Sequence, residues 1–300
     1  MPTIRFPGVI PAVTTPFDDR GDVAPAALER NVAALLDDGM AGIVGAGTMG
    51  EAGSLSAAER RLVIETIAGV AGGRVPVVAG VSAGTPAQAI DYATDAAAAG
   101  ADALMCLPPV LYRGDDREIE AYFAAVAGAT DLPVMLYNNP EASGLDLPPE
   151  LIVRIAERVE NVVAVKECSG DARRIAGILA ASGGELEVLV GGDDWALEGF
   201  CGGATGWVSG VAVVAPGECR SLYEHCRAGE LEAARAINAR LLPLARFDMT
   251  PKLVQYFKAA QDAVGRTGGP CRPPRLELAD IERDALAAAL RTLGVAEVAA

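Results

Sequence analysis

The sequence predicts a (β/α)8 TIM barrel followed by a C-terminal three-helix extension. Three observations indicate this fold. Eight short, apolar and β-branched segments alternate along the chain with Ala-rich helical segments. The strand segments are apolar throughout, as expected for parallel strands whose faces are both covered. Eight strands are the number that closes such a barrel, and 300 residues suit one barrel with a small appendage.

The strand and helix segments follow one another in strict alternation. We expect strands at 9–14, 42–46, 75–80, 103–107, 134–137, 162–166, 187–190 and 205–208. We expect helices at 25–38, 57–71, 86–99, 116–128, 149–159, 171–182, 194–201 and 217–228. Capping-box spacings at 56–59, 85–88 and 115–118 mark the starts of three of these helices.

The strand pattern ends near residue 229. Segments 231–242, 251–264 and 281–293 follow with helical, amphipathic spacing and are separated by a loop at 265–274. We therefore assign residues 1–229 to a catalytic barrel domain and residues 230–300 to a C-terminal helical extension.

Composition narrows the class of protein. A net charge of −15 disfavours a nucleic-acid partner, because phosphate binding needs clustered Lys and Arg. The six cysteines form no CxxC pair, which favours a reducing compartment. The longest uncharged stretch, 199–217, is rich in Gly and contains Pro216, so we expect no membrane span. Residues 1–7 lack the basic and apolar regions of a signal peptide, so we expect a cytoplasmic protein.

Histidine chemistry is disfavoured in the same way. His225 is the single histidine, and it lies in a polar helical stretch. A catalytic triad or a histidine-rich zinc site would have to use it, so we expect a surface residue and no metal site.

A GxGxxG match at 45–50 raises the alternative of a nicotinamide oxidoreductase on an open sheet. A dinucleotide site needs the helix to begin inside the glycines, but here the helix start falls at Ser56. It also needs an acidic residue after the next strand, where the chain reads Gly80-Val81-Ser82. The match is therefore set aside.

Lys166 is the first candidate catalytic residue. It is one of three lysines, with Lys252 and Lys258, and it ends the apolar sixth strand. Barrel active sites lie at the carboxyl ends of strands. Burial there is expected to lower the amine pKa, as a Schiff-base nucleophile requires. The alternative is a structural ion pair with Glu167 or Glu51.

Two further strand ends carry matching chemistry. Tyr137 ends the fifth strand, and its phenol can move the protons needed to form and dehydrate a carbinolamine. The turn after the second strand contains Gly47, Thr48 and Gly50. Its glycines let backbone N–H groups approach a substrate carboxylate, and Thr48 adds a hydroxyl donor.

Together these motifs resemble the dihydrodipicolinate synthase and N-acetylneuraminate lyase family of class I aldolases. The resemblance covers essentially the whole chain. The segments that carry it are 8–17, 47–51, 76–80, 137–140, 165–167 and 191–194.

The resemblance implies an enzyme in which Lys166 forms an imine with pyruvate or a larger 2-oxo acid. It implies that Tyr137 relays protons through Thr48. It further implies that the turn carrying Gly47, Met49 and Gly50 holds the substrate carboxylate, and that Val208 lines the pocket. It implies a homotetramer. No metal or organic cofactor is expected, because the imine itself is the electron sink.

Departures from the family pattern bear on the substrate. True dihydrodipicolinate synthases have a second threonine where this chain has Met49, and an arginine where it has Ala142. That arginine holds the carboxylate of the aldehyde substrate, and alanine cannot replace it. The synthases' tyrosine pair after the fourth strand is missing here, and Tyr112, followed by Arg113, is the candidate to take its place in substrate binding.

These departures favour catabolic relatives. Met49 resembles the deaminases of 1-pyrroline-4-hydroxy-2-carboxylate, and the segment 268–274 resembles 4-hydroxy-2-oxoglutarate aldolases. We favour a deaminase or lyase of that kind. A 2-keto-3-deoxy sugar acid aldolase or dehydratase, dihydrodipicolinate synthase itself and a non-catalytic barrel that binds a sugar acid remain open.

Overall fold

A computed structural model describes residues 4–110 and 112–295. Residues 1–3 lie outside it, and with them part of the segment in which no signal peptide is expected. Leu111, next to Tyr112, also lies outside the described residues. None of the helices in the described part of the chain has the length and apolar character needed to span a bilayer.

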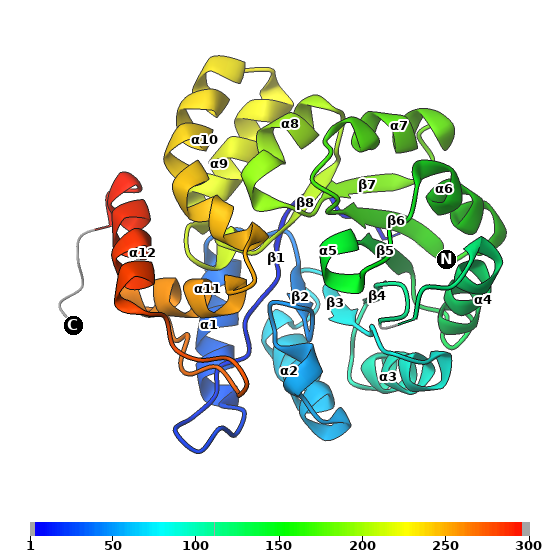
Figure 1. Cartoon of the computed structure of the whole chain (residues 1–300), viewed down its shortest axis with the longest axis horizontal. Coiled ribbons are helices and arrows are strands. Elements are labelled where there is room, and N and C mark those ends of the chain that lie inside the picture. The colour runs from blue at the N-terminus through cyan, green and yellow to red at the C-terminus, as the bar shows by residue number, and fades with distance from the viewer. Residues whose placement is uncertain (1–3, 111, 296–300) are drawn as a thin grey trace.

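Eight parallel strands form the predicted barrel (Figure 1). They are β1 (Gly8–Pro11), β2 (Ile43–Gly45), β3 (Val77–Gly80), β4 (Ala103–Cys106), β5 (Val134–Asn138), β6 (Val162–Glu167), β7 (Glu187–Val190) and β8 (Gly206–Ser209). Neighbours in sequence are neighbours in the sheet, and β1 pairs with β8. A parallel bridge between Ala12 and Val44 joins β1 to β2, which brings the two ends of the sheet together.

The helices that cover the strands also match the prediction closely. They are α1 (Pro25–Asp37), α2 (Ala57–Ala71), α3 (Pro86–Ala98), α4 (Asp116–Ala127), α6 (Pro149–Arg158), α7 (Arg173–Ala181), α8 (Ala196–Cys201) and α9 (Pro216–Ala228). Ser56 and Asp115 form complete capping boxes, whereas Thr85 makes only the bond from the Gln88 N–H. One short helix, α5 (Pro140–Ser143), was not predicted.

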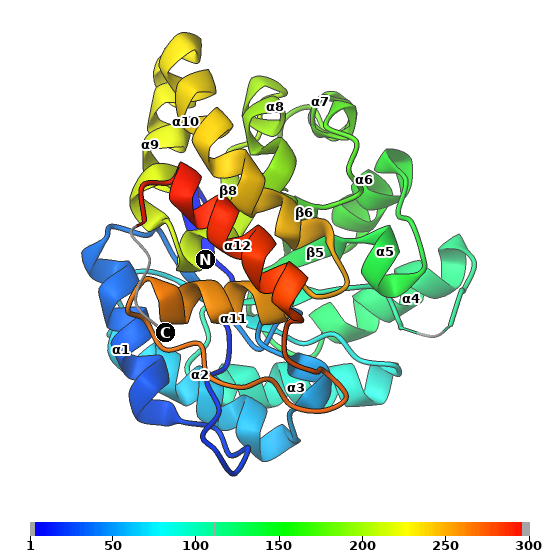
Figure 2. The ribbon, with the colours of Figure 1, turned by 60° about the vertical axis from the view of Figure 1, so that its left-hand side comes forward.

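The extension packs onto one side of the barrel. It consists of α10 (Leu231–Ala245), the 3-10 turn η4 (Arg246–Met249), α11 (Leu253–Ala263) and α12 (Asp280–Thr292). Figure 2 shows α12 lying across α10 and α11. The prediction that the first of these helices ends before Pro243 was wrong. A proline one turn from a helix end removes a single hydrogen bond, so the helix continues to Ala245.

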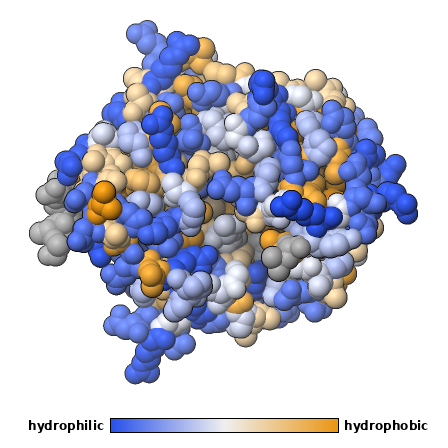
Figure 3. All heavy atoms as spheres, in the orientation of Figure 1, coloured by the Kyte–Doolittle hydropathy of each residue, from blue (hydrophilic) through white to orange (hydrophobic). Residues whose placement is uncertain are grey.

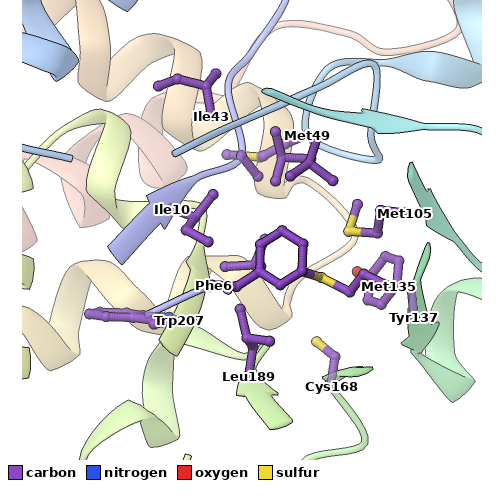
Figure 4. Close-up of a cluster of buried hydrophobic side chains, with 14 of the residues drawn as sticks. Phe6, Ile10, Ile43, Met49, Met105, Met135, Tyr137, Cys168, Leu189 and Trp207 are labelled. Atoms are coloured by element: carbon purple, nitrogen blue, oxygen red, sulfur yellow. The ribbon is translucent and has the colours of Figure 1, made fainter. Parts of the chain in front are cut away.

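The interior of the barrel is filled by large apolar side chains, including those of Phe6, Ile10 and Leu189 (Figure 4). Trp207 is also buried, but it packs edge to face on Phe200 of α8. The face seen in Figure 3 is mostly hydrophilic, with apolar residues in small scattered groups. His225 lies on α9, where its Nδ1 contacts Glu230 at 2.5 Å, as expected for a surface histidine.

Two strained residues enclose the turn after β2. Ala46 and Glu51 both have positive φ values, 52° and 54°, which non-glycine residues rarely adopt. The backbone of Ala46 also lies so close to β3 that a Cβ on Gly80 would come within 2.4 Å of its carbonyl oxygen. Such strain persists only where the surrounding structure enforces it, and it often marks a functional segment.

Candidate active site

Lys166 and Tyr137 are brought together by the register of two neighbouring strands. They are direct partners in the parallel pairing of β5 with β6, so their side chains leave the sheet on the same side. The Nζ atom of Lys166 lies 4.2 Å from the centre of the Tyr137 ring. Both side chains are buried at the carboxyl ends of their strands, as predicted.

Asn139 orients the phenol. Its Nδ2 donates to the Tyr137 hydroxyl at 2.9 Å, and its Oδ1 accepts from the Ala142 N–H as the cap of α5. Because the phenol oxygen accepts this bond, its own proton remains available for donation elsewhere. The expected relay from Tyr137 through Thr48 stays a prediction.

A cavity of about 450 Å³ opens in front of these two residues. Gly47, Thr48 and Met49 form one wall, next to Tyr137 and Lys166. Met49, Met105, Tyr137 and Cys168 lie in the same cluster of side chains in Figure 4. The predicted lysine, phenol and threonine therefore meet at one space large enough for a small organic acid.

Glu51 fixes the turn after β2 through contacts with the C-terminal extension. Its Oε1 lies 2.7 Å from the Nζ of Lys258 on α11, and both side chains are almost fully buried. Its Oε2 accepts from the Arg272 N–H at 3.1 Å and lies 3.4 Å from Arg275. Glu167 accepts a hydrogen bond from the Asn138 side chain at 3.0 Å. Neither Glu51 nor Glu167 forms a structural ion pair with Lys166.

The Lys166 pKa corrects one prediction. Burial lowers it, as expected, whereas Tyr137, Cys168 and Asp248 raise it when they are ionised, and with all three ionised the pKa lies above its usual value. Near neutral pH two of these groups are uncharged, because burial raises the pKa of Tyr137 and raises that of Cys168 to about 12. Asp248 is then the anion that acts on the lysine.

Asp248 is the main functional candidate that sequence reasoning missed. It lies in η4 of the extension, yet its side chain lines the cavity together with Lys166. Its Oδ2 accepts from the Asp193 N–H at 3.2 Å. Burial raises the pKa of Asp248 to about 6. Burial and repulsion from Asp248 raise the pKa of Asp193 well above its usual value.

Three of the predicted substrate-binding residues do not line this cavity. The Gly50 carbonyl accepts a hydrogen bond from the Thr15 hydroxyl at 2.8 Å, and this bond holds the turn in place. Val208 is fully buried in β8, and Gly210, two residues later, reaches the cavity instead. Tyr112 is 55% exposed and donates to Glu118 at 2.9 Å, beside a separate surface hollow.

The place at which true synthases have a carboxylate-binding arginine lies in the cavity wall. Glu141 and Ala142 of α5 both line the cavity. Arg113 does not line it, and its guanidinium lies beside Gly144. Arg275 of the extension reaches the far wall of the cavity, although it also contacts Glu51.

Comparison with known proteins identifies the family of the chain. The model of the dihydrodipicolinate synthetase family matches residues 5–293. The chain is 36% identical to the 4-hydroxy-tetrahydrodipicolinate synthase of Methanopyrus kandleri over 292 residues, 97% of each chain. It is also 36% identical to that of Methanothrix thermoacetophila over 276 residues, 92% of each chain.

Solved structures give the same result. A dihydrodipicolinate synthase from Bacillus anthracis superposes with a TM-score of 0.93 at 30% identity, over 96% of this chain and 99% of that one. One from Acinetobacter baumannii, in complex with pyruvate, superposes with a TM-score of 0.91 at 31% identity, over 97% of this chain and 100% of that one. The chain thus belongs to the dihydrodipicolinate synthetase family of Schiff-base enzymes, which are class I aldolases and lyases.

Proposed function

We propose that Lys166 forms an imine with the ketone of pyruvate or another small 2-oxo acid. The observation that carries this proposal is the direct pairing of Lys166 with Tyr137 at the mouth of the barrel, 4.2 Å from amine to ring centre. The Acinetobacter baumannii relative, whose structure contains pyruvate, supports the choice of ligand. The turn at Gly47, Thr48 and Met49 would hold the substrate carboxylate through its backbone N–H groups.

Borohydride reduction tests this step. In the presence of pyruvate, reduction should add the mass of the reduced ketoacid to one site, and peptide mapping should place it on Lys166. Lys252 and Lys258 serve as internal controls, because they are the other two lysines of the chain. Lys166→Ala and Lys166→Arg should both abolish labelling, since a guanidinium stays protonated and cannot attack. A label on either control lysine would contradict the assignment.

For the complete reaction we propose deamination, dehydration or aldol cleavage of a hydroxylated 2-oxo or cyclic imino acid. 1-Pyrroline-4-hydroxy-2-carboxylate is the first substrate to test, and 2-keto-3-deoxy sugar acids follow. 4-Hydroxy-2-oxoglutarate, which carries a second carboxylate, comes last. The supporting observation is the charge of the cavity wall. Ala142 stands where a carboxylate-binding arginine is expected, and Glu141 and Asp248 add two carboxylates. Such a wall suits hydroxyl groups better than a second carboxylate.

A second candidate is the synthesis of 4-hydroxy-tetrahydrodipicolinate from pyruvate and aspartate semialdehyde. The curated relatives quoted above carry this name, which favours it on similarity alone. One feature of the cavity also favours it, because Arg275 reaches the cavity and offers a guanidinium from a different direction. The Arg275 guanidinium lies 3.4 Å from the Glu51 carboxylate, which already neutralises part of its positive charge.

A direct comparison on one enzyme preparation separates the two candidates. We expect turnover of the hydroxylated substrate and weak condensation of the semialdehyde, because losing a charged hydrogen-bond partner costs about 1.5–3 kcal/mol. Condensation with kcat/KM above about 10⁴ M⁻¹s⁻¹ would instead establish the synthase. Arg275→Met is the informative variant, since it should abolish condensation only if Arg275 binds the second carboxylate.

The homotetramer implied by the family resemblance remains a proposal. Sedimentation velocity would measure the assembly directly. Tyr112, which is exposed within the single chain, is the residue to examine if copies associate near α4.

A further inference from the structure

The carboxylate of Asp248 is held at the mouth of the barrel by the end of β7, which a second carboxylate links to the end of β8. Its Oδ2 accepts from the Asp193 N–H after β7, and the Asp193 Oδ2 accepts from the Val211 N–H after β8 at 2.6 Å. A Cβ built on Gly210 would lie 3.2 Å from the Asp193 Oδ2 and 3.2 Å from the Asp248 Oδ1. The two carboxylates therefore converge at one point beside the cavity.

This placement puts acid–base groups on both sides of Lys166. The strand order is β5, β6, β7 and β8. Tyr137 ends β5 and Lys166 ends β6, while Asp248 reaches the cavity beside β7 and β8. A substrate bound to the lysine would have the phenol on one flank and the carboxylate on the other.

The two flanking groups have different protonation states near neutral pH. Burial raises the pKa of Tyr137, so its phenol is a neutral donor. The pKa of Asp248 is about 6, raised by burial and lowered in part by Lys166, so it is a carboxylate above that pH. Two neighbouring groups whose environments separate their protonation states can divide the roles of acid and base.

We propose that Asp248 is the base of imine formation, which takes a proton from the Lys166 ammonium and returns it to the departing hydroxyl. This inference rests on the proposed imine at Lys166 and deepens it. Lys166 and Asp248 line the same cavity, and each acts on the other through its charge. The proton would cross the space between them through a bound water or an oxygen of the substrate.

The step balances as follows. Asp248 accepts one ammonium proton, and the free amine forms the C–N bond to C2 of the 2-oxo acid. Tyr137 donates to the ketone oxygen as negative charge develops there and regains a proton from the attacking nitrogen, which leaves a neutral carbinolamine. The protonated Asp248 then gives its proton to the hydroxyl, the C–O bond breaks and water leaves. The iminium remains, and Asp248 is a carboxylate again.

The pH dependence of this step depends on every ionisable group around Asp248. The ends of β5 and β6 contribute Tyr137, Lys166 and Cys168. The 3-10 turn η2 (Asp193–Trp195) contributes Asp193 and Asp194, and Arg246 of η4 acts on Asp194. Glu141 and Arg275 line the same cavity, but Asp248 is the carboxylate there whose pKa burial raises to about 6, so a break in the rate near pH 6 is expected to report Asp248.

Single-turnover trapping tests the proposal. Wild-type enzyme, pyruvate and borohydride give the rate of imine formation at Lys166 as a function of pH. The rate should fall as the pH decreases through about 6, because Asp248 then becomes protonated and loses its role as base. Asp248→Asn keeps the shape of the side chain but removes the base. It should slow trapping by roughly 10²–10⁴-fold and remove the break near pH 6, so that the rate simply follows the fraction of free Lys166 amine.

Two further variants make the test specific. Asp194→Asn removes the adjacent carboxylate of η2 and should keep trapping within about twofold of wild type at neutral pH. Asp248→Ala leaves space in the cavity, so added formate should restore part of the trapping rate. Thermal melts of each variant establish that the fold is intact.

Each outcome decides a different point. If wild type is never labelled at Lys166, the proposed function fails, and this inference fails with it. If wild type is labelled but Asp248→Asn traps pyruvate equally fast, the inference alone is wrong. A slow variant that keeps the break near pH 6, with no rescue by formate in Asp248→Ala, would also overturn it, since the loss would then be structural.

Discussion

The extension contributes two lysines that form ion pairs of equal length in very different surroundings. Lys258 and Glu51 lie 2.7 Å apart with side chains only 2% and 0% exposed. Lys252 and Glu282 also lie 2.7 Å apart, but their side chains are 40% and 22% exposed. Replacing each lysine by methionine therefore compares a buried pair with a partly exposed pair of the same N–O distance.

The buried pair should matter far more for stability. Removing one partner of a buried pair leaves an uncompensated charge, which typically costs about 3–5 kcal/mol. Arg275 and the Arg272 N–H still contact Glu51 in the Lys258→Met variant, so we expect the lower end of that range. For a chain of this size about 1 kcal/mol shifts Tm by roughly 2 °C, so Tm should fall by roughly 6 °C or more.

Thermal unfolding followed by circular dichroism at neutral pH measures both variants. Lys258→Met should show the large decrease, and Lys252→Met should remain close to wild type because exposed pairs contribute little. The double variant Glu51→Gln with Lys258→Met should recover part of the loss, since no buried charge is then left unpaired. Equal Tm values for the two single methionine variants would refute the reasoning.

Two further substitutions probe the site itself. Tyr137→Phe keeps the ring and should retain the fold while turnover falls by roughly 10²–10⁴-fold; turnover near wild type would return Tyr137 to a packing role. Gly191→Ala would place a Cβ 2.9 Å from the Lys166 Cε, so borohydride labelling should weaken and stability should fall by about 1–3 kcal/mol. Gly177→Ala, on an open face of α7, is the matched control and should leave both measurements unchanged or raise stability slightly.

The barrel and its central pair were predictable because they depend on local, periodic signals. Apolar segments of strand length alternate with helical spacing, so the position of Lys166 at a strand end could be located from sequence. Tyr137 follows from the same argument, since parallel strands end at the same edge of the barrel. The cavity wall at Gly47, Thr48 and Met49 needed only the recognition of the turn.

The remaining site residues depend on long-range packing that no local pattern records. Asp248 is one acidic residue in a short 3-10 turn outside the barrel, and only the docking of η4 against η2 brings it to the cavity. Arg275 comes from a loop with no regular spacing. The raised pKa of Lys166 could not be predicted either, because burial was visible in the sequence but the opposing effects of Tyr137, Cys168 and Asp248 were not.

The position of Lys258 has a consequence for the order in which the molecule is made. Glu51 belongs to the second strand–helix unit, whereas its counterion follows the eighth. A ribosome therefore releases every strand of the barrel before the cation that neutralises Glu51 emerges. Until then, closing the barrel would desolvate a carboxylate without compensation, which disfavours premature closure. A chain truncated before α11 should consequently accumulate as an incompletely packed barrel. Docking of the extension would then be the last step in the folding of the newly synthesised chain.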